Sequence, residues 1–222
     1  IDPDNLSGSI RNWAYCQNEN GGSPGKKNSV DGPHPDVIPP SLKDAWLEND
    51  SMLVIDFGEP VTMPTADRNP VRVISSGLVC DTILQCPVFR DRFSIVFQKP
   101  LEPHKVEKLE TSEKIADWAG NTLAGSNTLH FGRPGRVDSL DLVINELMFD
   151  PPPYGGDYVE LVNRSDRIAA LDSICLARAD DNGGPEKLVP LSEKTRWFLP
   201  GEIICFTADA QWVEEHYPET VS

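Results

Sequence analysis

The apolar residues of this chain occur in short runs separated by turn-forming residues, and this spacing constrains its fold more than any other feature. Residues 52–57, 93–97 and 142–149 are such runs, rich in Val, Ile, Leu and Phe. Proline (20) and glycine (16) make up about a sixth of the 222 residues. Short runs bounded by Gly, Pro, Asn and Asp, recurring about every 10–15 residues, are typical of antiparallel strands. The pattern therefore predicts an all-β fold.

One short helix is also predicted, over residues 210–216. Asp209 precedes it and suits the N-cap position, because its carboxylate can accept a hydrogen bond from a free backbone N–H. Trp212 and Val213 would form its apolar face.

Composition divides the chain into three parts. Residues 1–36 are polar, with a small apolar island at Ile10, Trp13 and Tyr15, so we expect an extended segment without a core of its own. The turn sequence at 132–135 predicts a boundary between β-domains over 37–134 and 135–222. The first core is predicted to contain Leu53, Ile55, Phe57, Phe93, Ile95 and Phe97. The second is predicted to contain Val143, Ile144, Leu147, Val159, Leu161, Cys205 and Phe206.

The acidic composition narrows the range of partners. Asp and Glu number 35 against 20 Lys and Arg, which gives a net charge of −15. Such a chain repels phosphates, so we expect neither a nucleic acid nor an anionic membrane surface as partner. No apolar run approaches the roughly 18–20 residues that cross a bilayer, so direct membrane insertion is not expected either.

The sequence contains no recognisable catalytic constellation. The four histidines, at 34, 104, 130 and 216, have no metal-ligand spacing to one another or to a cysteine. Asp150, Asp157 and Glu160 flank a Pro- and Gly-rich loop and are candidate calcium ligands, although a solvated acidic rim is the alternative. Four tryptophans, Trp46, Trp118, Trp197 and Trp212, could stack on sugars or simply pack. We expect no enzymatic activity and no obligatory cofactor.

Two stretches of the last part resemble a bacterial lamin-tail domain. They are Val143-Ile-Asn-Glu-Leu-Met-Phe-Asp-Pro-Pro152 and Gly155-Gly-Asp-Tyr-Val-Glu-Leu-Val-Asn-Arg-Ser165, followed by Leu199-Pro-Gly201 and residues 203–207. The resemblance implies an immunoglobulin-like sandwich, and the family pattern continues past residue 222. Asn12-Trp13 with residues 21–29 is similar to the end of such a domain, so the resemblance implies that 1–36 and 135–222 are complementary pieces, packed within one chain or between repeats.

The middle part, 37–132, resembles a bacterial immunoglobulin-like domain. The resemblance rests on Ile38-Pro-Pro40, residues 53–60 and 97–101, and Asp117-Trp-Ala-Gly-Asn121, in which Trp118 replaces a cysteine that some members carry. The expected architecture is thus two immunoglobulin-like β-sandwiches with an extended N-terminal segment.

Alternating modules of these two kinds resemble exported surface proteins of the Bacteroidota, often carried by type IX secretion. The resemblance implies a secreted, cell-surface location and a non-enzymatic structural or adhesive role, with other protein domains as partners. The alternative is a carbohydrate- or calcium-binding accessory domain of an exported enzyme. Those bacteria O-glycosylate an Asp-Ser/Thr motif, which would place glycans on Ser51, Thr82, Ser139 and Ser173, although chance would produce one or two such matches.

Disulfides are permitted in the location that the resemblance implies. Cys80 and Cys86 could close a local loop, and Cys175 and Cys205 could be neighbours in one sandwich, which leaves Cys16 unpaired. Five unpaired thiols are the alternative, because free cysteine is often buried.

Overall fold

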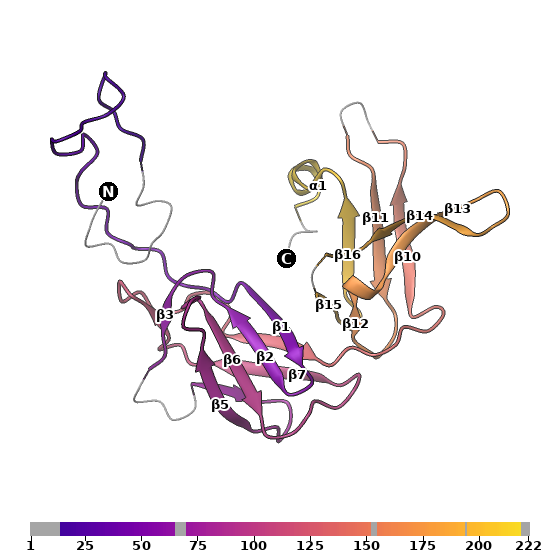
Figure 1. Ribbon diagram of the computed structural model, residues 1–222. Helices are drawn as coiled ribbons and strands as arrows, with labels where there is room; N and C mark the ends of the chain where they lie inside the picture. The colour runs from indigo at the N-terminus through magenta and orange to yellow at the C-terminus, as the bar shows by residue number, and fades with distance from the viewer. Residues whose placement is uncertain (1–13, 65–69, 152–154, 194, 219–222) are drawn as a thin grey trace. The chain divides into compact units, whose positions relative to one another are not determined.

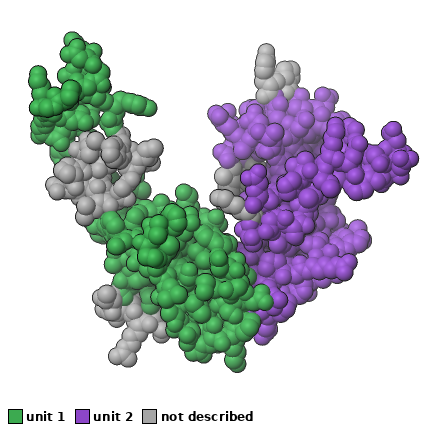
Figure 2. Space-filling model, in the orientation of Figure 1, with its two compact units in different colours: residues 1–100, 107–131 green, residues 101–106, 132–222 purple. Residues whose placement is uncertain are grey.

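The computed structural model describes residues 14–64, 70–151, 155–193 and 195–218, and its regular structure is mostly β-strand (Figure 1). The chain forms two compact units (Figure 2). The first comprises residues 1–100 and 107–131, and the second comprises 101–106 and 132–222. The all-β prediction is therefore confirmed.

The first unit contains two sheets. One has the antiparallel order β1 (Asp44–Asn49), β2 (Met52–Asp56), β6 (Arg92–Phe97) and β5 (Cys80–Gln85). The other has the order β4 (Val71–Val73), β7 (Val106–Thr111) and β9 (Thr128–Gly132). A short ladder joins β3 (Val61–Thr62) to β8 (Ala116–Asp117). Residues 14–36 form turns without strand or helix.

The two sheets of the first unit share one apolar core. All six predicted residues are buried: Leu53, Ile55, Phe57, Phe93, Ile95 and Phe97. They lie on β2 and β6 or directly after β2, and side chains on one face of a strand recur every second residue. Phe97 on β6 stacks on Phe131 of β9, with ring centroids 5.6 Å apart. This contact joins the two sheets as layers around a common interior.

The second unit is built on a three-stranded sheet. Its antiparallel order is β10 (Leu142–Met148), β11 (Tyr158–Asn163) and β16 (Ile203–Thr207). Two ladders, β12 (Ala169–Ala170) with β15 (Trp197–Phe198) and β13 (Cys175–Ala179) with β14 (Pro185–Pro190), accompany it. A short 3-10 helix spans Leu171–Ser173. Helix α1 (Ala210–His216) begins as predicted, because Asp209 Oδ1 accepts a hydrogen bond of 3.0 Å from the Trp212 N–H.

The core of the second unit differs from the predicted one. It consists of Leu161, Ala169, Leu171, Phe198 and Ile204. Leu161 confirms the prediction, and Val159 and Phe206 pack at its border. Ile144 and Leu147 contradict it, because they are 59% and 53% exposed. Both lie on β10, which is an edge strand of the sheet in the part of the chain that the structure describes.

The five cysteines are free thiols in the structure, and neither predicted pair forms a disulfide. Cys80 begins β5 and Cys86 follows its last residue, so an extended strand separates them by on the order of 15–20 Å. A disulfide needs Cα atoms about 4.4–6.8 Å apart. Cys175 is exposed on β13, whereas Cys205 lies on β16 opposite Glu160 in a different sheet.

Candidate functional site

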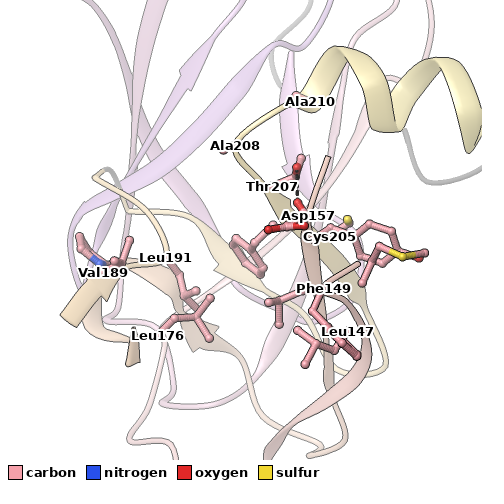
Figure 3. Close-up of a pocket in the computed structure, with 15 residues that line it drawn as sticks. Leu147, Phe149, Asp157, Leu176, Val189, Leu191, Cys205, Thr207, Ala208 and Ala210 are labelled. Atoms are coloured by element: carbon pink, nitrogen blue, oxygen red, sulfur yellow. Dashed lines mark hydrogen bonds between the residues drawn. The ribbon is translucent and has the colours of Figure 1, made fainter. Parts of the chain in front are cut away.

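An apolar groove of about 720 Å³ lies in the second unit, between the β10–β11–β16 sheet and the β13–β14 hairpin (Figure 3). Leu147 and Phe149 line it from the β10 side, and Leu176, Val189 and Leu191 line it from the hairpin side. We call it the β10 groove. Phe149 is 79% exposed and Val189 is 59% exposed, so large apolar side chains face solvent at its mouth.

The groove continues the apolar face of the sheet. The register places Ile144 opposite Leu161, which lies opposite Ile204. Directly opposed residues of neighbouring strands project on the same face, so each such row is one continuous strip. Along this row the side chains change from buried on β11 and β16 to exposed on β10. The core-facing surface of the sheet therefore extends to its β10 edge, where Ile144 is exposed.

A second row of opposed residues across β16, β11 and β10 shows the same change from packed to exposed side chains. Leu147 lies opposite Val159, which lies opposite Phe206. Val159 and Phe206 pack against the core, and Leu147 is more than half exposed.

Strand β10 is also an open edge for hydrogen bonding. It pairs with β11, and no strand of the described residues pairs with its other side. The register shifts between Ile144 and Glu146, a bulge of the kind that often marks sheet edges. An edge strand with exposed apolar side chains is a template on which another strand can pair.

Acidic side chains line the groove or lie on the strands next to it. Asp157 lines it, and Glu146 and Glu160 lie on the adjoining strands. Tyr158 Oη donates a hydrogen bond to Glu146, and the Asn145 side-chain amide donates one to Glu160. Burial, and then the negative charges of Glu160 and Glu146, raise the pKa of the Cys205 thiol, which also lines the groove. This thiol is thus held in its protonated, weakly nucleophilic form.

The structure places the three predicted calcium ligands around this part of the second unit. Asp150 and Asp157 are exposed, and Glu160 is half-buried with its hydrogen bond to Asn145. Within the described residues, the one trio of carboxylates close enough to share an ion is a different one: Asp36, Glu59 and Asp117 in the first unit. Sequence reasoning missed this trio, because Asp36 and Asp117 are 81 positions apart.

The predicted glycosylation residues lie at or near the surface. Thr82 on β5, Ser139 before β10 and Ser173 in the 3-10 helix are exposed, whereas Ser51 in the β1–β2 turn is half-buried. Their modification stays a prediction.

The four tryptophans have other contacts. Trp197 is 9% exposed, and Trp212 stacks on His216 with centroids 4.4 Å apart. Arg92 lies 5.4 Å from the ring centre of Trp46, and Arg90 lies 5.5 Å from that of Trp118. Trp197 is thus buried, the other three rings have aromatic or cation–π contacts, and sugar stacking stays a prediction.

Comparisons with protein-family models, with curated proteins and with solved structures found no match to this chain. In the part of the chain that the structure describes, no helix is long and apolar enough to cross a membrane.

Proposed function

We propose that this chain is a non-enzymatic structural or adhesive module of a secreted, cell-surface protein, and that it binds another protein at the β10 groove. The occupant we propose is an extended strand with alternating apolar side chains and basic residues at its ends. The observation that carries the proposal is the open edge of β10, whose exposed apolar residues continue the core-facing surface of the sheet.

A strand is the occupant that suits both features of this edge. Its backbone would pair with the unpaired groups of β10, and its side chains would cover Ile144 and Leu147. Covering each large apolar side chain contributes about 1–2 kcal/mol, which favours a strand with several apolar positions.

The negative charge of the chain favours a partner strand with basic residues at its ends. The chain carries a net charge of −15, and Glu146, Asp157 and Glu160 lie on β10 and β11 or line the groove. Opposite charge at the rim speeds association and disfavours acidic partners.

The lining of the groove supports binding rather than catalysis. Its polar groups are few, and the Thr207 hydroxyl donates its hydrogen bond to the backbone oxygen of Asp157. The protonated Cys205 thiol has no histidine beside it among the lining residues.

The finer parts of the proposal rest on the resemblance described above. These are the immunoglobulin-like nature of the two units, the lamin-tail character of the second, the exported surface location with type IX secretion in the Bacteroidota, and the O-glycosylation. The accessory-domain alternative has one observation of its own in its favour, the carboxylate trio of the first unit.

Peptide binding tests the proposed function. The fluorescein-labelled peptide KKTVTITVKK should bind the full chain in the micromolar range, and KKTVPIPVKK and EETVTITVEE should bind more weakly, because proline breaks strand pairing and glutamate meets like charge. We expect Leu147→Lys to weaken binding at least about tenfold, since it places a charge at the contact.

A matched control distinguishes peptide binding at the groove from non-specific binding to exposed apolar side chains. Val88 in the first unit is 77% exposed, so Val88→Lys makes the same kind of change elsewhere. It should leave the fluorescence anisotropy titration unchanged. Equal loss in both variants, or equal binding of all three peptides, would contradict the proposal.

A further inference from the structure

Three carboxylates from distant parts of the sequence meet in the first unit. Asp36, Glu59 and Asp117 each place one oxygen within 4.8 Å of those of the other two. Asp36 precedes the first strand, Glu59 follows β2, and Asp117 ends β8. The β3–β8 ladder pairs Val61 with Asp117, which brings the chain next to Glu59 alongside Asp117.

Asn121 donates hydrogen bonds to two members of this trio. Asn121 donates its backbone N–H to Asp117 Oδ1 and its side-chain amide to Asp117 Oδ2, both over 2.8 Å. The same amide donates to the backbone oxygen of Asp36 over 3.1 Å. The Asp117–Asn121 turn thus fixes the approach of the N-terminal segment to the β-structure.

The trio contains a buried oxygen that lacks a partner. Asp36 Oδ2 exposes less than 1 Å² and forms no hydrogen bond, whereas Oδ1 of the same carboxylate accepts from the Ile38 N–H. Asp117 is only 4% exposed. No ion pair of the described residues involves any of the three carboxylates. An unpartnered carboxylate oxygen among like charges is costly unless a cation neutralises it.

The neighbouring charges also act on Glu59. Burial first, and then the negative charges of Asp36 and Asp117, raise the pKa of its carboxyl group.

We propose that Asp36, Glu59 and Asp117 bind one Ca²⁺ ion. Calcium takes about six to eight oxygen ligands in adaptable geometry, and three carboxylates from separate segments provide the charged ones, with water completing the shell. The ion would attach the N-terminal segment, through Asp36, to the β-structure that carries Glu59 and Asp117. This site lies in the first unit and is separate from the β10 groove.

Calorimetry on the EDTA-treated full chain at pH 7 tests this site. CaCl₂ should bind once per chain, with a dissociation constant of about 10⁻⁴–10⁻³ M, the range of weak calcium modules. Glu59→Gln should weaken binding at least about tenfold, because it removes one of three charged ligands. Glu160→Gln and Asp157→Asn, in the second unit, should leave binding unchanged.

Terbium luminescence provides a second readout. Trp118 directly follows Asp117, so its excitation should sensitise a Tb³⁺ ion at the site, and Ca²⁺ should displace that ion. Trp118→Phe should remove most of the luminescence while the calorimetric Ca²⁺ titration is retained. Thermal unfolding without Ca²⁺ should be the same for Glu59→Gln as for the native chain, or higher for the variant, which shows that the variant is folded.

Three outcomes would overturn the inference. The first is no saturable Ca²⁺ binding to the native chain. The second is unchanged binding in folded Glu59→Gln, and the third is loss of binding in Glu160→Gln or Asp157→Asn. None of these outcomes measures peptide binding at the β10 groove, so the two proposals fail independently.

Discussion

Asn163→Ala is expected to destabilise the second unit by about 3 kcal/mol or more. Asn163 is fully buried at the end of β11. Its side-chain amide donates to the backbone oxygens of Arg167 and Phe198, both over 2.8 Å. Its Oδ1 accepts from the backbone N–H and the hydroxyl of Ser165. Alanine removes the donor of the buried Phe198 oxygen and breaks the part-buried hydrogen bonds to Ser165 and Arg167. A buried group left unpaired costs about 1–3 kcal/mol.

Urea unfolding followed by tryptophan fluorescence measures this effect, because Trp197 is buried in the same unit. Asn145→Ala is the matched control. Asn145 is exposed on β10 and its side-chain amide donates to the Glu160 side chain at the surface, so its loss should change stability by less than about 1 kcal/mol. Equal midpoints for the two variants would show that the Asn163 network does not stabilise the unit.

Gly132→Ala should cost about 3 kcal/mol, at the upper end of what overpacking usually costs. A Cβ at this position would lie 2.3 Å from the backbone oxygen of Lys105 and 2.4 Å from Ile168 Cδ1. Ile168 is 1% exposed, and the Lys105 oxygen belongs to the backbone, so neither atom can move aside easily. All three residues lie in the second unit, where residues 101–106 run beside the chain that follows β9.

Gly77→Ala is the control for Gly132. A Cβ at Gly77 meets no atom within 4 Å. The substitution should be neutral or stabilise by up to about 1 kcal/mol, because alanine restricts the unfolded chain. Calorimetric unfolding of both variants compares them, and a Gly132→Ala protein as stable as the native one would mean that the chain around Lys105 and Ile168 adapts to the added methyl group.

The first core could be predicted from the sequence because its pattern is local. Phe93, Ile95 and Phe97 alternate on a strand between two others, so every inward position is covered. The apolar run at 142–149 led to a wrong prediction for Ile144 and Leu147, since such a run cannot tell an edge strand from a central one. Nothing in the local sequence shows that Asn163 is buried, because its hydrogen bond to the Phe198 oxygen joins residues 35 positions apart.

The candidate sites required the fold for the same reason. The β10 groove combines β10 with the β13–β14 hairpin, and no local pattern shows that these segments approach each other. The carboxylate trio combines Asp36, Glu59 and Asp117, which only the β3–β8 ladder and the Asn121 contacts bring together. Sequence reasoning instead named Asp150, Asp157 and Glu160 as candidates beside the alternative of a solvated acidic rim; they are close in sequence but are not a trio that could share an ion in the described structure.

Hydrogen–deuterium exchange of the full chain with KKTVTITVKK tests most directly that the β10 edge binds a partner strand. Amides within β10 (142–148) should become protected, because a paired strand hydrogen-bonds to its open side. Strand β5 (80–85), one of the two edge strands of the four-stranded sheet in the first unit, should be unchanged. Unaltered exchange over 142–148, or equal protection over 80–85, would contradict the proposed function.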